Sequence, residues 1–153
     1  MKQEIGVHHL LKTTTMLTTT WLWIETSKSI TLNLKSSEGV KILHQLVTKS
    51  DIFLHNLVET KTPSLSIDYK TLNNLNPSLI YASVSGFGDT GPMASKGALD
   101  FTIQAMSGLM SITGGKDTSP YKVGFAVSDI LTGQMLFSSI LAAWIARERD
   151  VNK

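Results

Sequence analysis

From residue 29 onward, apolar and polar residues follow two alternating kinds of pattern. Short segments with a period of two, or with continuous apolar residues, predict strands, and segments with apolar residues on one helical face predict helices. The expected strands are 29–34, 52–57, 79–84 and 123–127. The expected helices run from a cap at Ser36 or Ser37 through Val47, and over 68–76, 98–112 and 130–150. Strands and helices therefore alternate along the chain.

This alternation predicts an α/β fold, a mainly parallel sheet with flanking helices joined by right-handed crossovers. Ligands of such sheets bind at the carboxyl ends of the strands. Asn56, the glycine-rich loop 86–92 and Asp129 follow three of the expected strands. We therefore expect these three features near one edge of the sheet.

Residues 1–28 lack such a pattern and contain the biased run TTTMLTTT. We predict an irregular N-terminal segment over 1–28 and one domain over 29–153. The N-terminus has no secretory signal pattern and no arginine, so secretion and a transit peptide are not expected. No apolar run approaches the roughly 18 residues needed to span a membrane, so we expect no membrane partner.

The composition and net charge exclude several kinds of ligand and catalytic group. The chain has 153 residues, a formal net charge of +2 and no cysteine. This charge does not predict nucleic-acid binding, although a small positive excess suits an anionic ligand. Cysteine chemistry is excluded, and the four histidines show no metal-binding spacing, so no metal site is expected.

Asp129 is the main candidate for chemistry. Aspartate is a preferred N-cap, and Asp129 comes just before the expected helix 130–150. It also fits a carboxylate nucleophile that attacks an activated acyl group. The 86–92 loop, GFGDTGP, allows close approach of a ligand or is a plain connection. It is neither a Walker A loop nor a dinucleotide fingerprint.

Five segments resemble, in order, the class III coenzyme A (CoA) transferases of the CaiB/BaiF type, which include formyl-CoA and succinate–hydroxymethylglutarate CoA transferases. They are SITLNLKSSEG (29–39), SDIFLHN (50–56), IDYKTLNNLNPSLIYASVSGFGDTGP (67–92), KGALDFTIQAMSGLMSITG (96–114) and VGFAVSDILTG (123–133). The resemblance implies part of a Rossmann-like large domain. It also implies transfer of CoA from an acyl-CoA thioester to a small carboxylic acid. CoA would be a substrate, with no permanently bound cofactor.

The resemblance also assigns residues. Asp129 matches the catalytic aspartate, which forms an aspartyl intermediate. The positions that match CoA contacts are Leu32, Lys35, Asn56, Leu57, Lys96 and Gly97. Full-length members form homodimers. A racemase branch has a histidine where this chain has Leu99, so racemase chemistry is not expected.

Some family positions differ. The family motif E-N-F-R-P-G corresponds to HNLVET (55–60), without its Arg, Pro and Gly, and a basic CoA-binding position falls at Ser64. The alternative to a CoA transferase is therefore a non-catalytic truncated remnant that binds CoA weakly or acts through protein contacts. The expected location is cytoplasmic or mitochondrial.

Overall fold

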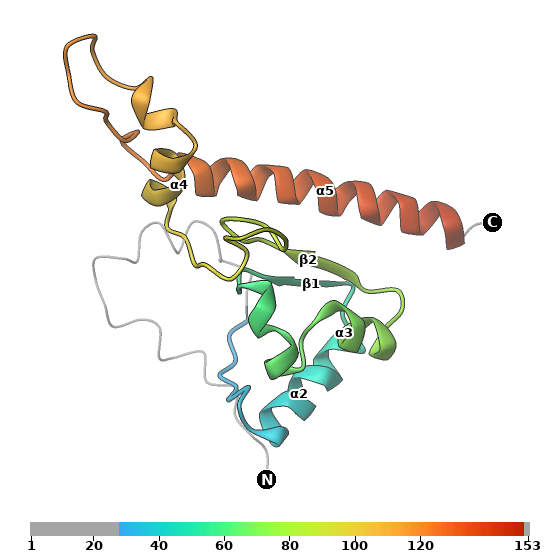
Figure 1. The fold of residues 1–153 in the computed structure, drawn as a ribbon. Helices are drawn as coiled ribbons and strands as arrows, with labels where there is room; N and C mark the ends of the chain where they lie inside the picture. Colours follow the sequence, from blue (N-terminus) through green and yellow to red (C-terminus); the bar gives the residue numbers. More distant parts are fainter. Residues whose placement is uncertain (1–27, 152–153) are drawn as a thin grey trace.

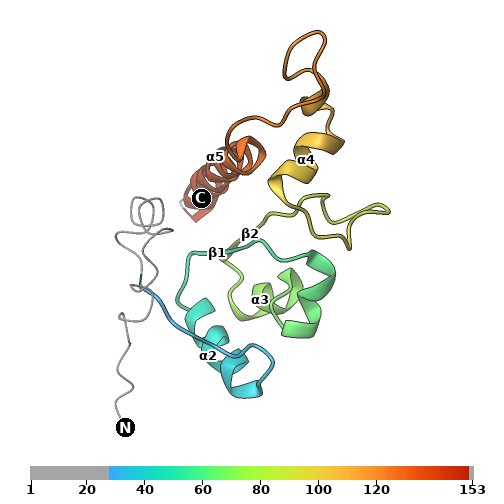
Figure 2. The ribbon, with the colours of Figure 1, turned by 90° about the vertical axis from the view of Figure 1, so that its left-hand side faces the viewer.

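The structure is a computed structural model that describes residues 28–151, so the predicted segment 1–28 lies, apart from Lys28, outside the described residues. Within 28–151, α5 lies over one face of a small sheet and α2 and α3 lie on the other (Figures 1 and 2). The helices and strands are α2 (Ser37–Val47), β1 (Ile52–His55), α3 (Tyr69–Leu75), β2 (Ile80–Ser83), α4 (Asp100–Met106) and α5 (Val127–Val151). Short 3₁₀ turns are η1 (Glu59–Lys61), η2 (Pro63–Leu65) and η3 (Leu109–Ser111).

The sheet is parallel, as predicted. β1 and β2 pair in register, from Ile52 opposite Ile80 to His55 opposite Ser83. The connection between them passes through η1, η2 and α3. Because both strands point the same way, their carboxyl ends meet at one edge, beside the N-terminal end of α5.

The core lies between the sheet and the helices α2 and α3. Val47, Ile67, Leu72 and Leu79 are buried there, and the Phe53 side chain packs against them from β1. Burying a side chain of this size stabilises the folded chain by about 1.5–3 kcal/mol. The core therefore holds β1 and β2 in place and fixes the edge at which they end.

Both helices below the sheet begin with a side-chain cap. The Ser36 hydroxyl accepts the Gly39 N–H at 3.1 Å at the start of α2. Asp68 Oδ1 accepts the Thr71 N–H at 3.0 Å at the start of α3. These bonds satisfy N–H groups that have no partner within the helix, and they confirm the predicted helix starts.

Two expected strands are absent from the described residues. Residues 29–34 are irregular, because nothing in 28–151 offers them a neighbouring strand; Asn33 instead begins a turn, its carbonyl oxygen accepting the Ser36 N–H. Residues 123–126 form no strand, and the chain bends at 124 and 125. The Val123 N–H donates to the side chain of Gln104 and the Phe125 carbonyl accepts from it, so a side chain replaces the expected strand partner.

The last two helices also differ in length from the predictions. The expected helix 98–112 ends at Met106, because Gly108 adopts a left-handed conformation with φ of 82° and a 3₁₀ turn follows. α5 starts at Val127, three residues before the expected start, and runs to Val151.

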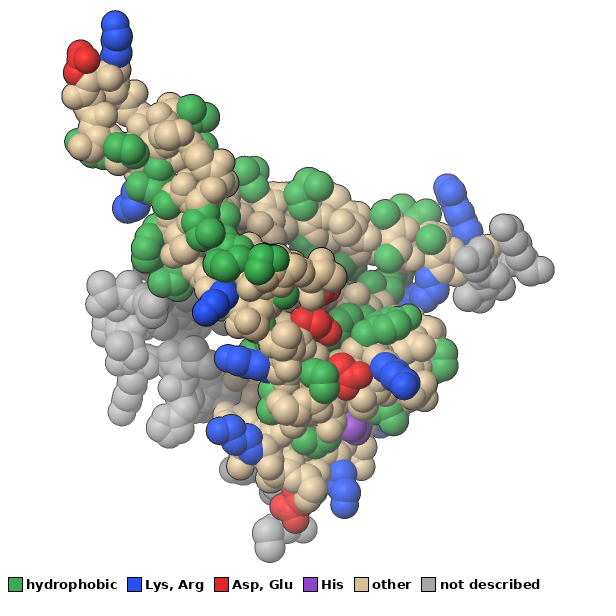
Figure 3. Space-filling model, viewed as in Figure 1, with side chains coloured by type: hydrophobic (Ala, Val, Ile, Leu, Met, Phe, Trp, Pro, Cys, Tyr) green, Lys and Arg blue, Asp and Glu red, His purple; other side chains and the backbone are tan. Residues whose placement is uncertain are grey.

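The statement that no apolar run reaches membrane-spanning length is wrong. Residues 127–149 of α5 are long and apolar enough to cross a bilayer by length and composition, and none of that stretch is buried. The sequence analysis missed this run because small and polar residues interrupt it. Length and composition do not distinguish a spanning helix from one that another protein surface covers. Figure 3 shows apolar side chains exposed along this region and along α4.

Candidate active site

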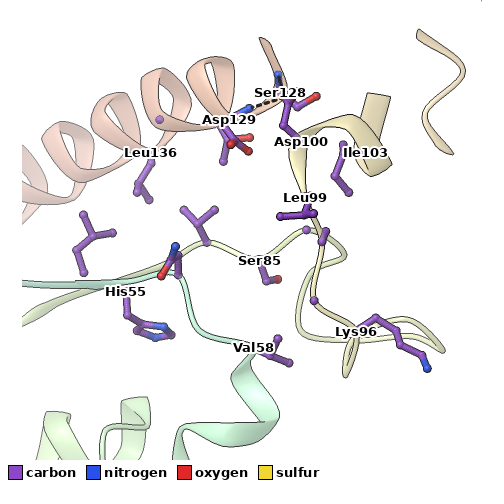
Figure 4. A pocket seen from close by; sticks show the side chains of 18 residues that line it. His55, Val58, Ser85, Lys96, Leu99, Asp100, Ile103, Ser128, Asp129 and Leu136 are labelled. Atoms are coloured by element: carbon purple, nitrogen blue, oxygen red, sulfur yellow. Dashed lines mark hydrogen bonds between the residues drawn. The ribbon is translucent and has the colours of Figure 1, made fainter. Parts of the chain in front are cut away.

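A cavity of about 790 Å³ opens at the carboxyl edge of the sheet. Its walls come from the ends of β1 and β2, the segment 96–100 and the first turns of α5 (Figure 4). The glycine at position 86 allows this arrangement, since a β-carbon there would clash with the side chain of Ala98. The lining residues are Leu54, His55, Asn56, Val58, Val84, Ser85, Gly86, Lys96, Gly97, Ala98, Leu99, Asp100, Ile103, Ser128, Asp129, Thr132, Gly133 and Leu136.

Four of the seven sequence-predicted site residues line this cavity. They are Asp129, Asn56, Lys96 and Gly97, from three separate parts of the chain. The other three lie outside the lining: Leu32 and Lys35 precede α2, and Leu57 follows β1. Of the 86–92 loop only Gly86 lines the cavity.

Asp129 stands in the first turn of α5 and is exposed. The interpretation of Asp129 as an N-cap is wrong, because α5 already begins two residues earlier, at Val127. Its carboxylate is therefore not used to cap the helix and faces the cavity, opposite His55 and Val58 (Figure 4). A carboxylate near a helix N-terminus lies in the positive end of the helix dipole, which favours the anion.

Asp100 performs the capping instead, from α4. Its Oδ1 accepts the Ser128 N–H at 2.8 Å and the Asp129 N–H at 3.3 Å. Its Oδ2 accepts from Gln104 Nε2 at 2.5 Å. Desolvation raises the pKa of Asp100, but the hydrogen bonds from Gln104, Ser128 and Asp129 outweigh it, and the pKa lies below its ordinary value.

Sequence reasoning did not assign Asp100 and Gln104 to the site. One signal was present: they lie four residues apart on a predicted helix, a spacing at which side chains face each other. The bonds from Asp100 to residues 128 and 129 depend on tertiary structure and have no local signature.

A second set of polar side chains supports the opposite wall. His55 Nδ1 accepts the Leu57 N–H at 3.2 Å, so in this geometry the proton of the neutral ring is on Nε2. That nitrogen lies 2.7 Å from Tyr81 Oη, which donates to the Ile67 carbonyl at 3.2 Å. Glu59 Oε2 lies 3.7 Å from His55 Nε2. These contacts hold the chain at residues 56–58, where Asn56 and Val58 line the cavity.

No three His, Asp or Glu side chains within the described part of the chain converge as a metal site would require. The cationic group in the lining is the exposed Lys96, at the rim. The arrangement offers a carboxylate, an amide and a cation around one cavity, which suits a ligand with both an electrophilic carbonyl and anionic groups.

A parallel sheet with a cavity and a carboxylate at its carboxyl edge defines an α/β domain, with the cavity at the edge where ligands of such sheets usually bind. A sequence model of CoA-transferase family III matches residues 12–152. The chain therefore belongs to CoA-transferase family III, the family that the sequence motifs resemble.

Several relatives are named for their reactions. A succinate–glutarate CoA-transferase of Agrobacterium fabrum is 44% identical over 80% of this chain and 31% of its own length. The human succinyl-CoA:glutarate CoA-transferase is 36% identical over 78% of this chain and 27% of its own. An acetyl-CoA:oxalate CoA-transferase of Acetobacter aceti is 43% identical over 80% and 32%. The chain thus spans about a third of the length of these relatives.

Solved structures show the same fold. A CaiB/BaiF family protein from Brucella suis aligns with a TM-score of 0.77 and 39% identity, over 80% of this chain and 32% of its own. A hypothetical protein from Mycobacterium tuberculosis aligns with a TM-score of 0.75 and 27% identity, over 80% and 36%. The α/β prediction is confirmed.

Proposed function

We propose that this chain carries the nucleophile of a CoA transferase, which moves CoA from an acyl-CoA thioester to a small carboxylic acid. The observation that supports this most is the position of Asp129, on the wall of the cavity at the carboxyl edge of the sheet. The activities named for the relatives, on acyl-CoA thioesters and on succinate, glutarate or oxalate, suggest the class of substrate.

The proposed reaction begins with attack by an Asp129 carboxylate oxygen on the thioester carbonyl carbon. The carbon–sulfur bond breaks, CoA leaves as thiolate, and a mixed anhydride forms. The thiolate then attacks the Asp129 carbonyl carbon, which releases the donor acid and leaves an aspartyl-CoA thioester. Attack by the acceptor carboxylate, and return of the thiolate to the acceptor carbonyl, yields the new thioester and free Asp129. No external proton or oxidant is needed.

The other proposed site residues bind CoA. Lys96 at the rim suits a phosphate. A β-carbon placed at Gly97 would have no neighbouring atom within 4 Å, so a ligand can approach the backbone there. Asn56 offers an amide to the ligand inside the cavity. We propose that Leu32, Lys35 and Leu57 contact the part of CoA that extends outside the cavity. In this proposal CoA is a substrate and no cofactor is held permanently.

The wider assignments are proposals too. We divide the chain into an N-terminal segment 1–28 and a partial large domain 29–153, and we expect a homodimer, in a cytoplasmic or mitochondrial location. The alternative function is a non-catalytic remnant that binds CoA weakly or acts through protein contacts. It is favoured by the missing basic side chain at Ser64 and by the large apolar side chains exposed on α4 and α5.

The decisive variant is Asp129→Asn, which keeps the shape of the side chain but cannot form the anhydride. The purified chain is incubated with succinyl-CoA, trapped with hydroxylamine, and the peptide containing residue 129 is analysed by mass spectrometry. The parent should give a trapped adduct and Asp129→Asn none. Asp117→Asn, in an exposed turn, is the matched control and should react like the parent.

An Asp129→Asn variant as reactive as the parent would remove Asp129 from the reaction. If neither protein gives an adduct and calorimetry detects no CoA binding, the remnant function is the correct one.

A further inference from the structure

Gln104 is the centre of a hydrogen-bond network that connects α4 to the segment before α5. Its side chain is completely buried, at 0% exposure. Nε2 donates to Asp100 Oδ2 at 2.5 Å and to the Phe125 carbonyl oxygen at 3.3 Å, while Oε1 accepts the Val123 N–H at 2.8 Å. Because both ends of the amide have partners, its orientation is fixed, and it fixes Asp100 and the 123–125 segment in turn.

Asp100 extends this network to the start of α5. Its Oδ1 accepts the N–H groups of Ser128 and Asp129, two of the groups that have no partner within their own helix. Most caps come from the residue just before the helix. Here the cap comes from another helix, 28 residues earlier, so α4 and the nucleophile-bearing turn are held in one geometry.

We propose that Asp100 is a positioning residue for Asp129, and that Gln104 holds Asp100 in place for this purpose. The inference rests on the proposed function, in which Asp129 is the nucleophile. In that reaction Asp129 changes from an anion to a neutral anhydride or thioester and back. A side chain whose charge changes in this way cannot serve as a constant anionic partner for the start of its own helix.

Asp100 supplies that constant partner. It takes no part in bond formation, so it stays ionised and keeps the two N–H groups satisfied at every stage. Attack on the thioester requires the carboxylate and carbonyl at roughly 3–3.5 Å with the correct alignment. Loosening the first turn of α5 should therefore slow acylation while leaving the CoA contacts at Lys96 and Gly97 in place.

The test compares three changes to the network. Asp100→Ala removes every bond to α5. Asp100→Asn keeps the acceptor for α5 but sets its amide nitrogen against Gln104 Nε2, so two donors meet. In the double variant Asp100→Asn/Gln104→Glu, the new amide donates to the new carboxylate, whose second oxygen still accepts the Val123 N–H. The 3.3 Å bond to the Phe125 carbonyl is lost, and a carboxylate oxygen then faces that carbonyl oxygen, so the double variant should restore part of what the single one damages.

Asp68→Ala is the matched control. Asp68 caps α3 through Thr71, as Asp100 caps α5, but it lies away from the cavity. Two quantities are measured on the full chain. The first is amide hydrogen exchange at Ser128 and Asp129, which reports the cap directly. The second is the rate of adduct formation with succinyl-CoA. It is described by the rate at saturating thioester and by the thioester concentration that gives half of that rate.

In Asp100→Ala, exchange at Ser128 and Asp129 should rise about five- to tenfold, as expected for a lost cap. The saturated acylation rate should fall by about tenfold or more, with the half-saturating concentration changed less than about twofold. Asp100→Asn should show smaller changes of both kinds, the double variant should recover part of them, and Asp68→Ala should show neither.

Unchanged exchange in Asp100→Ala would overturn the inference, as would an equal loss of acylation rate in Asp68→Ala. A failure of the proposed function looks different, because Asp129→Asn would then react like the parent or the parent would give no adduct. In that case the exchange data alone still decide whether Asp100 holds the start of α5.

Discussion

At the residue scale, Tyr81 joins the core to the wall of the cavity. Its ring lies 5.7 Å from that of Phe53 in the core cluster, and its hydroxyl contacts both His55 and the Ile67 carbonyl. Burial raises the pKa of Tyr81, and the negative charge of Glu59 raises it further, to about 12. The neutral phenol is therefore the form that the fold requires.

The first prediction from this residue concerns alkaline pH. Because the folded-state pKa of Tyr81 is raised above its ordinary value of about 10, its contribution to stability is complete below pH 10. It should be lost as the pH rises from 10 towards about 12. Absorbance titration of tyrosinate should show one late step, which Tyr81→Phe removes and Tyr121→Phe leaves in place. A late step that persists in Tyr81→Phe would contradict this assignment.

At the scale of the element, α5 is fixed at both ends and exposed along much of its length. Asp100 holds its first turn. Near its other end, Arg147 Nη1 donates to the Ser78 carbonyl at 2.9 Å and Nη2 pairs with Asp51 Oδ1 at 3.0 Å. The guanidinium also lies 4.3 Å from the centre of the Trp144 ring. The helix thereby spans the sheet from its carboxyl edge to the residues before β1 and β2.

Replacing Arg147 should separate these contributions. The Asp51 side chain is 64% exposed, so the ion pair itself should contribute under about 1 kcal/mol. The bond to the Ser78 carbonyl and the contact with Trp144 should contribute about 1–2 kcal/mol together. Urea unfolding should therefore show a larger loss of unfolding free energy for Arg147→Ala than for Asp51→Asn. Arg147→Lys should lose nearly as much as Arg147→Ala, because lysine lacks the planar guanidinium group. Equal losses for Asp51→Asn and Arg147→Ala would show that the ion pair dominates.

The elements that the sequence predicted correctly are those whose stability is local or contained in one βαβ unit. The helices α2 and α3 carry their own caps, and β1 and β2 lie close together in sequence. The expected strands 29–34 and 123–127 fail for a different reason. Apolar alternation shows which face of a segment is buried, but a strand also needs a neighbour for its backbone groups. Near residue 123 the side chain of Gln104 takes that place.

The site was predictable to a similar degree. Family motifs and strand-end positions located Asp129, Asn56, Lys96 and Gly97, which the fold gathers around one cavity. Their roles in binding and catalysis stay proposals. The cap from Asp100 to residues 128 and 129 was missed, because a bond between segments 28 residues apart depends on how α4 and α5 meet. Residue preference had favoured the local cap, Asp129.

At the scale of the whole molecule, the described part of the chain has more apolar surface than its core can cover. Large apolar side chains are exposed on consecutive turns of α5, namely Ile130, Leu131, Met135, Phe137, Leu141 and Ile145, and on α4 at Phe101 and Met106. Exposed apolar patches of this kind usually mark a surface that another protein segment covers. The isolated chain is therefore expected to associate with itself.

The prediction is that sedimentation of the purified chain shows dimers or larger species whose share grows with concentration. Met135 and Phe137 are 70% and 60% exposed, so neither supports the fold of the monomer. Met135→Glu or Phe137→Glu should shift the chain towards monomer because a charge cannot be buried unpaired in an apolar contact. Gln134→Glu adds the same charge to a polar, exposed position of the same helix and should change association little.

A chain that stays monomeric and melts cooperatively would show that this surface is tolerated in water. An equal effect of all three variants would show that net charge, rather than the apolar face of α5, controls association.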